Sequence, residues 1–151
     1  MTATRTLIPG HVGLNVTDLD RSVAFYRDVL GLTLIGESKE DGRRFAFFGT
    51  DGRPQVTLWQ QAEGTYAPAA AGLHHLALQA DSLDEVRGFE RNLKEYGVEF
   101  AYDGVVPHGE GAASGGIFFR DPDGVRLEIY APDGAEGAPA PVAEAPTCGF
   151  F

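Results

Sequence analysis

Two short stretches of the chain alternate hydrophobic and polar residues, and a histidine opens each of them. In residues 11–16 the aliphatic side chains share one face of a predicted strand, and His11 falls on the opposite face. Residues 75–80 repeat this phase, and His75 takes the position of His11. The alternative is a pair of incidental strand histidines, but the matching phase favours two equivalent functional side chains.

The residues after the first strand predict a helix and three further strands. Asp18 or Asp20 is placed to cap a helix over residues 21–30, and Gly31 is a typical helix stop. Runs rich in β-branched and aromatic residues then predict strands over residues 32–37, 44–49 and 56–60.

The second half of the chain repeats this order. Ser82 and Glu85 have the spacing of a capping box, and the apolar stripe of a helix follows until Gly97. The spacing from His11 to Asp20 equals the spacing from His75 to Asp84, which supports a duplicated unit. The strands expected after the second helix cover residues 98–102, 115–120 and 125–130.

The chain is long enough for one domain with a proper hydrophobic core. A polar lead-in that is expected to fray precedes this domain, and a tail rich in alanine, proline and glycine follows it. The tail is expected to be disordered up to Thr147. Phe150 and Phe151 are expected to lie free in solvent, the alternative being docking on the domain or on a partner subunit. The predicted boundaries are 1–8 for the lead-in, 9–131 for the domain (modules 9–61 and 73–131, linker 62–72) and 132–151 for the tail.

Charge and composition exclude several classes of partner. The formal net charge is -10, which disfavours binding to nucleic acid or to an anionic membrane. No apolar run approaches the ~20 residues that a membrane span needs, so a cytoplasmic location is the default expectation. The one cysteine, Cys148, has no partner for an internal disulfide, and its place in the tail argues against a nucleophilic role.

Glu128 shares the phase of the two histidines. It lies in the middle of a predicted strand, between hydrophobic positions that form the opposite face. Two neutral imidazoles and one carboxylate form a known ligand set for divalent metals, and this set leaves positions open for substrate or oxygen. His11, His75 and Glu128 are therefore the predicted metal ligands. A solvent-facing carboxylate on an exposed sheet is the alternative for Glu128.

Three further residues follow from aligning the two halves. Thr57 is the counterpart of Glu128, and its hydroxyl is a poor ligand, so three protein ligands are expected. Trp59 and Tyr130 stand two residues further on and are predicted to give the site aromatic walls. Packing against a neighbouring subunit is the alternative for these two rings.

The other two histidines have weaker signals. His74 points away from His75 in a strand, which suggests a core or edge histidine or a group that supports the ligands. His108 lies in the glycine-rich loop over residues 106–111, where a lid or proton-transfer residue is possible and a solvated histidine is the favoured alternative. His108 is the only catalytic candidate.

With these residues in view, the chain resembles the vicinal oxygen chelate superfamily, which includes glyoxalases, bleomycin-resistance proteins, fosfomycin-resistance transferases, methylmalonyl-CoA epimerases and extradiol dioxygenases. The resemblance implies an α+β fold of two paired βαβββ modules, whose curved mixed sheets surround a cavity. It also implies a homodimer. The segments that carry the likeness are HVGLNVTD (11–18), SVAFYRDVLGL (22–32), HHLAL (74–78) and FRDPDGVRLE (119–128).

Carried over residue by residue, the resemblance again implies His11, His75 and Glu128 as metal ligands. The fourth ligand of glyoxalases and epimerases falls on Thr57, which disfavours those activities. The positions at which dioxygenases of the family carry a catalytic base and a tyrosine fall near Gln55 and Phe118, so this chain lacks both groups there. The residues with which the transferases hold phosphonate and potassium are missing around Ala112 and Gly116.

These features predict a metal-dependent enzyme that acts on a small oxygenated or aromatic substrate, most like the dioxygenase and lyase branches. Fe(II) or Mn(II) suits the ligands best, and Zn(II), Ni(II) or Co(II) is also compatible. The alternative is a protein of the bleomycin-resistance type, which sequesters an aromatic antibiotic without chemistry. The residues expected to contact the small-molecule ligand are Thr57, Trp59, Phe118, Arg126 and Tyr130.

Overall fold

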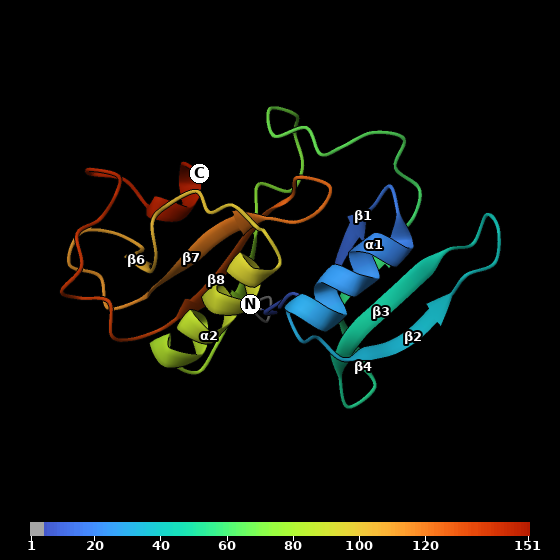
Figure 1. The fold of residues 1–151 in the computed structure, drawn as a ribbon, viewed down its shortest axis with the longest axis horizontal. Coiled ribbons are helices and arrows are strands. Elements are labelled where there is room, and N and C mark those ends of the chain that lie inside the picture. The colour runs from blue at the N-terminus through green and yellow to red at the C-terminus, as the bar shows by residue number, and fades with distance from the viewer. Residues whose placement is uncertain (1–4) are drawn as a thin grey trace. The chain divides into compact units, whose positions relative to one another are not determined.

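The computed structural model describes residues 5–151. The chain divides into two compact units, Met1–Gly64 and Thr65–Phe151, which we call the first and the second unit. Each unit holds a four-stranded mixed sheet, and each has its helical segment between the first and second strands (Figure 1). The predicted α+β class and its two repeated βαβββ modules are confirmed.

The first unit has the strand order β1-β4-β3-β2, in which β1 is parallel to β4 and the other pairs are antiparallel. A helical segment follows β1 and ends in a π-helical turn, η1. The elements are β1 (Val12–Asn15), α1 (Leu19–Ala24), η1 (Phe25–Val29), β2 (Leu34–Ser38), β3 (Phe45–Thr50) and β4 (Arg53–Trp59).

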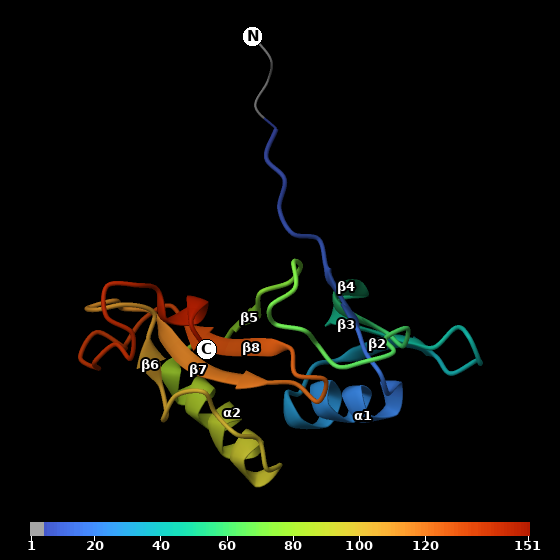
Figure 2. The ribbon, with the colours of Figure 1, turned by 90° about the horizontal axis from the view of Figure 1, so that it is seen from above.

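The second unit repeats this arrangement as β5-β8-β7-β6, with β5 parallel to β8. Figure 2 shows α2 against one face of this sheet and the C-terminal segment over the other. The elements are β5 (Leu76–Gln79), α2 (Leu83–Glu95), β6 (Val106–Pro107), β7 (Gly115–Arg120), β8 (Arg126–Ala131) and a final 3-10 turn, η2 (Thr147–Gly149).

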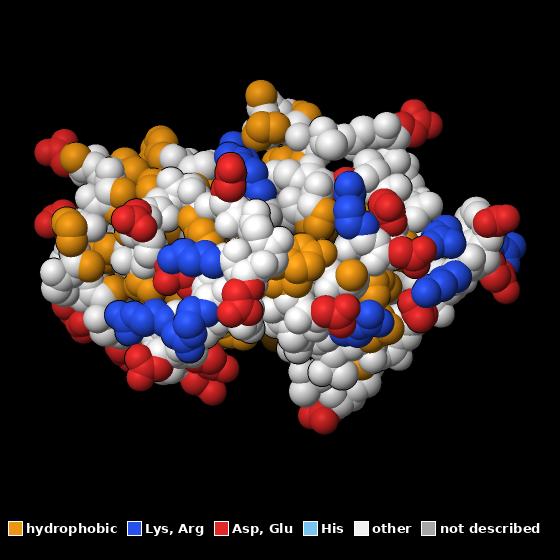
Figure 3. All heavy atoms as spheres, in the orientation of Figure 1, with side chains coloured by type: hydrophobic (Ala, Val, Ile, Leu, Met, Phe, Trp, Pro, Cys, Tyr) orange, Lys and Arg blue, Asp and Glu red, His pale blue; other side chains and the backbone are white. Residues whose placement is uncertain are grey.

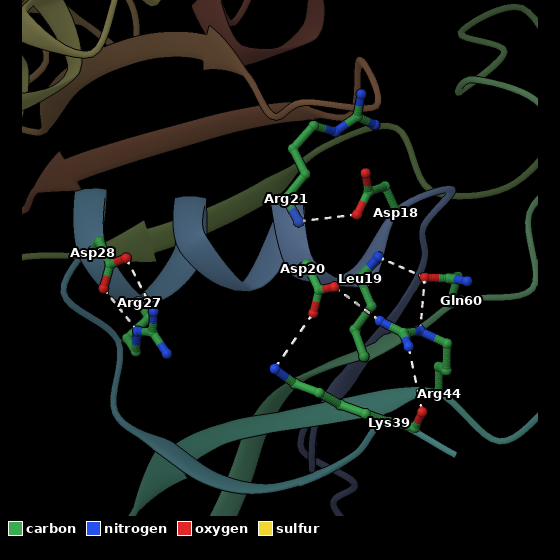
Figure 4. Close-up of polar contacts among 9 residues, drawn as sticks. All are labelled: Asp18, Leu19, Asp20, Arg21, Arg27, Asp28, Lys39, Arg44 and Gln60. Carbon is green, nitrogen blue, oxygen red and sulfur yellow. Dashed lines mark hydrogen bonds and ion pairs between the residues drawn. The ribbon is translucent and has the colours of Figure 1, made fainter. Parts of the chain in front are cut away.

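Asp18, and not Asp20, caps α1. The Asp18 carboxylate accepts a hydrogen bond of 3.1 Å from the backbone N–H of Arg21 (Figure 4). Asp20 points to the side and pairs with Arg44 at 3.1 Å and with Lys39 at 3.5 Å. Because Asp20 is well exposed, these ion pairs add little stability. The helical segment ends before Gly31, whose φ of 71° confirms the predicted stop.

The side chain of Gln60 connects the start of α1 to the sheet. Its Oε1 accepts a hydrogen bond of 2.8 Å from the backbone N–H of Leu19 and another of 3.3 Å from Arg44 Nε (Figure 4). The Leu19 N–H is one of the donors that a helix leaves unsatisfied at its first turn. Gln60 therefore completes the cap from the end of β4.

The two sheets have the same register. Gly13 pairs with Thr57 in the first unit, and Ala77 pairs with Glu128 in the second. The alignment of Thr57 with Glu128 is therefore confirmed. His11 and His75 stand just before β1 and β5, two residues ahead of the paired positions.

The prediction of a strand over residues 98–102 is wrong. Only Phe100 forms a bridge there, to Phe119, and the backbone N–H of Ala101 donates to Phe118 O at 2.8 Å. Gly104, with a φ of 69°, turns the chain before pairing can extend. The fourth strand of this sheet is instead β6, in the segment that the sequence indicated to be a loop.

The surface drawn in Figure 3 carries interspersed acidic and basic side chains, with hydrophobic groups between them. Residues 5–10 are exposed and form neither helix nor strand, as Figure 2 shows. Among the described residues, no helix has the length and apolar character needed to cross a membrane.

Candidate metal centre

The face of the second sheet that lies under the C-terminal segment carries Glu128 at its middle. Leu127 and Ile129, its neighbours in β8, are buried in the hydrophobic core. Side chains alternate along a strand, so Glu128 lies on the face away from that core, opposite Phe118 of β7. Its side chain is nevertheless only 5% exposed. A carboxylate buried to this extent requires partners, because an unpaired buried charge costs several kcal/mol.

Each oxygen of Glu128 faces a different histidine. His108 Nε2 lies 2.9 Å from Glu128 Oε2, which is a hydrogen bond. His75 Nε2 lies 3.6 Å from Glu128 Oε1, which is too long for a hydrogen bond but close enough for an electrostatic contact. Oε1 is therefore the oxygen that remains available to a cation beside His75.

His108 is held from both sides of its ring. Its Nδ1 lies 2.7 Å from Ser114 Oγ, and its Nε2 contacts Glu128. A neutral ring that donates from Nε2 and accepts the Ser114 hydroxyl proton at Nδ1 satisfies both contacts. The interpretation of His108 as a solvated loop histidine is wrong. His108 directly follows β6, and its partly buried ring contacts Glu128.

His75 is kept neutral by its surroundings. Burial lowers the pKa of its imidazole below 6.5, and this effect outweighs the opposing attraction of Glu128; His74, Arg126 and His108 lower the pKa further. His75 Nδ1 lies 2.9 Å from His74 Nδ1, so Nε2 is the nitrogen directed toward Glu128. Metal ligation requires a neutral imidazole, and His75 meets this condition. His74 itself is exposed, and its ring meets that of His75 edge-on, with a centroid distance of 5.1 Å.

We expect a proton NMR titration of the metal-free protein to give His75 a midpoint below 6.5. The folded chain then binds fewer protons than the unfolded chain, so the free energy of unfolding falls as the pH drops through 6.5 toward the lower value. The His75→Asn variant identifies the resonance. A midpoint at or above 6.5 would contradict the burial of a neutral ring.

The two terminal aromatics differ: Phe150 is 63% exposed, as expected, whereas Phe151 is docked on the second unit, contrary to the expectation. Thr147 is fully buried. The ring of Phe151 packs against Phe118 and His75, with centroid distances of 4.9 and 5.9 Å. The preceding residues are mostly alanine, proline and glycine, a composition that does not predict this contact. The contact depends on the final five residues.

This segment brings Cys148 to the carboxylate. The Cys148 sulfur, one nitrogen of His75 and one oxygen of Glu128 all lie within 4.8 Å of one another. Burial, and after it the charge of Glu128, raises the pKa of the Cys148 thiol. This proximity could not be predicted from the sequence, because no spacing along the chain connects Cys148 with His75 or Glu128.

The first unit presents aromatic side chains on the equivalent face. Trp59 Nε1 donates a hydrogen bond of 2.9 Å to Thr57 Oγ1, and Thr57 is 2% exposed. Phe45 and Phe47 stack at 5.0 Å and both contact the Trp59 ring, at 5.4 and 5.5 Å. The Thr57 hydroxyl thus accepts a hydrogen bond from the indole, and its predicted part in ligand binding stays a prediction.

Gly13 makes room for that contact. A Cβ at this position would lie 3.3 Å from Thr57 Oγ1 and 3.4 Å from Trp59 Nε1. His11, two residues earlier, is exposed and belongs to the first unit. Its predicted place in the ligand set with His75 and Glu128 stays a prediction.

The remaining predicted contact residues of the second unit border Glu128. The Tyr130 hydroxyl donates to Gln79 Oε1 at 3.0 Å, and its ring lies 5.1 Å from that of His108. Arg126 Nη1 donates to the backbone oxygen of His74 at 3.2 Å. These contacts fix side chains beside the carboxylate, and the substrate-binding roles themselves stay predictions.

The family profile described as the Glyoxalase/Bleomycin resistance protein/Dioxygenase superfamily matches residues 8–129. The chain belongs to this superfamily. The resemblance drawn from the sequence is confirmed by a match that spans both modules.

Two sequence relatives and one solved structure illustrate the relationship. The uncharacterized protein YaeR of Escherichia coli (strain K12) is 31% identical over 125 residues, which cover 80% of this chain and 92% of YaeR. A manganese-dependent 2,3-dihydroxybiphenyl 1,2-dioxygenase of Geobacillus genomosp. 3 is 28% identical over 80% of this chain and 35% of its own length. A glyoxylase/bleomycin resistance protein/dioxygenase domain from Frankia sp. EAN1pec shares the fold, with a TM-score of 0.69 at 24% identity over 85% of this chain and 99% of its own.

Proposed function

We propose that the second unit holds a divalent metal ion through His75 and Glu128, and that the chain is an enzyme acting on a small oxygenated or aromatic substrate. The dioxygenase and lyase branches of the superfamily are the nearest activities. The observation that carries this proposal is the approach of His75 Nε2 to Glu128 Oε1 at 3.6 Å on the face of the sheet that the C-terminal segment covers.

The donor groups fit such an ion. His75 supplies a neutral nitrogen, and Glu128 supplies a buried carboxylate oxygen, Oε1, that lies 3.6 Å from this nitrogen. Fe(II) or Mn(II) is the favoured ion, and Zn(II), Ni(II) or Co(II) is compatible with the same donors. The manganese dependence stated in the name of the Geobacillus dioxygenase supports this choice. A bound ion would supply Lewis-acid polarisation of adjacent substrate oxygens or activation of oxygen.

His108 and Ser114 support Glu128 through two consecutive hydrogen bonds. Ser114 contacts His108, and His108 contacts Glu128 Oε2. By holding Oε2, His108 orients the Glu128 carboxylate so that Oε1 faces His75. Such partners of a ligand set its orientation and basicity. We therefore assign His108 a positioning role, and its candidacy as a proton-transfer residue stays a prediction. Tyr130 supplies half-buried aromatic surface beside the carboxylate for an aromatic substrate, whereas Phe118, also expected to contact the ligand, is fully buried under the Phe151 ring.

The aromatic cluster of the first unit favours a second candidate. Phe45, Phe47 and Trp59 form a stacking surface suited to a flat ligand, and the net charge of -10 would attract a cationic one. A protein of the bleomycin-resistance type would sequester an aromatic compound there without chemistry. The homodimer and the cytoplasmic location expected from the sequence also remain proposals.

One experiment separates the two candidates. Protein purified without a tag is stripped with a chelator, reloaded with Fe(II) or Mn(II), and assayed for oxygen uptake with catechol and for Trp59 fluorescence. We expect metal-dependent turnover that His75→Ala abolishes. The Asp84→Asn variant serves as control, because this 97% exposed carboxylate lies on α2 and its loss should leave turnover unchanged.

Quenching of Trp59 by a cationic aromatic compound, unaffected by chelator and accompanied by no turnover, would favour sequestration. Failure of the wild-type protein to retain any of the tested metals would contradict the enzyme proposal directly.

A further inference from the structure

We propose that Cys148 is an additional ligand of the metal ion, supplied by the C-terminal segment and binding as a thiolate. This inference rests on the proposed function, since the ion is the one assigned to His75 and Glu128. The three side chains come from the start of β5, the middle of β8 and the η2 turn, and their donor atoms converge within 4.8 Å.

The segment that carries Cys148 is anchored immediately before it. The Thr147 hydroxyl donates to Pro107 O at 2.6 Å, and its backbone N–H donates to His108 O at 2.8 Å. The Tyr102 hydroxyl donates to Thr147 O at 3.1 Å. These bonds join the segment to β6 and to the backbone of His108, whose side chain holds Glu128. Pro107 and His108 therefore hold the residue before Cys148 through their backbone oxygens, while the side chain of His108 holds Glu128.

A second contact holds the segment after the cysteine. The Phe151 ring lies over Phe118, which faces Glu128 across the β7–β8 pair, and meets the His75 ring edge-on. Cys148 is thus bracketed by a buried hydrogen-bonded residue on one side and an aromatic contact on the other. These contacts hold the segment on both sides of Cys148, keep the sulfur within 4.8 Å of the ligand pair and pack the Phe151 ring against His75.

The distances suit a tetrahedral ion. Donors bound at ordinary zinc distances lie about 3.3 to 3.8 Å from one another. The 3.6 Å between His75 and Glu128 already falls in this range. The sulfur lies within 4.8 Å of both, so coordination requires it to approach them by about 1 Å.

A thiolate changes which metal the site prefers. Nitrogen and oxygen donors alone suit Fe(II) and Mn(II), whereas sulfur favours borderline and soft ions such as Zn(II) and Co(II). It also fills a position that a substrate would otherwise take. N/O/S sites generally bind Zn(II) and Co(II) more tightly than Mn(II), and the thiolate should widen this margin. A variant without the thiol should therefore show a smaller margin, closer to that of the nitrogen and oxygen donors alone.

Cobalt titration of the reduced, metal-free full chain tests the proposal without an activity assay. We expect a thiolate-to-cobalt charge-transfer band in the near ultraviolet that grows to one equivalent. Cys148→Ser should abolish the band and weaken Co(II) binding by at least about tenfold, while Mn(II) binding changes much less. Asp84→Asn is the control and should keep the band.

The outcomes separate this inference from the proposed function. If Co(II) binds in a manner that requires His75 and Glu128 but no thiolate band forms, the role of Cys148 is overturned and the metal centre stands. A band that survives His75→Ala and Glu128→Gln unchanged places the thiolate–cobalt contact elsewhere and overturns the inference. If no Co(II) or Mn(II) binding depends on His75 or Glu128, the proposed function fails as well.

Discussion

Replacing Glu128 by glutamine is expected to weaken Mn(II) binding by more than about 100-fold, beyond the loss seen when only a supporting residue of a metal site is changed. The amide keeps the volume of the side chain and leaves an oxygen for His108, but it removes the negative charge from the donor beside His75. Competition with a metal-sensitive dye measures the affinity. Circular dichroism of the variant establishes that the sheet is retained.

The matched control for this change is Asp84→Asn, which removes the same charge from an exposed position. If Glu128→Gln and Asp84→Asn bound Mn(II) equally well, bulk negative charge would explain the affinity, and the assignment of Glu128 would fail.

The second large effect concerns the packing of β7 on β8. A Cβ at Gly116 would overlap the carbonyl oxygen of Ile129 and lie 2.6 Å from Tyr130 Cα. Both obstacles are backbone atoms, so the strands must separate. We expect Gly116→Ala to lower the free energy of unfolding by about 3 kcal/mol, the upper end for overpacking, as measured by urea denaturation.

Gly36→Ala provides the comparison within another strand. Its Cβ would meet only the edge of the Phe47 ring, at 4.0 Å, so the change in stability should stay within about 1 kcal/mol. Equal stability of the two variants would contradict the close approach of β7 and β8. A selective loss in Gly116→Ala should also disturb metal binding, because Tyr130 and Glu128 belong to the displaced strand.

Alternation and offsets along the sequence were sufficient to predict the repeated order of elements, apart from the strand expected over residues 98–102, and the family resemblance supplied the paired modules. The phase of residues 11–16 and 75–80, and the alignment of Thr57 with Glu128, depend on local periodicity, which the paired registers confirm. The choice between Asp18 and Asp20 as helix cap was left open because both carboxylates precede the apolar run. Tertiary contacts decided it, since Arg44 and Lys39 pair with Asp20.

The parts of the site that were missed have no local signal. The contact of His108 with Glu128 depends on β6, a two-residue strand whose Pro107 is atypical of a strand interior. The approach of Cys148 depends on Thr147, whose hydrogen bonds reach residues about 40 positions away. Such long-range contacts follow from the folded sheet and cannot be inferred from spacing.

Anomalous diffraction from crystals of the full chain grown with Mn(II) tests the central claim most directly. The account predicts a manganese peak within coordination distance, about 2.0 to 2.2 Å, of both His75 Nε2 and a Glu128 oxygen. A manganese peak bound elsewhere, with the His75 and Glu128 side chains in contact only with each other and with His108, would contradict it.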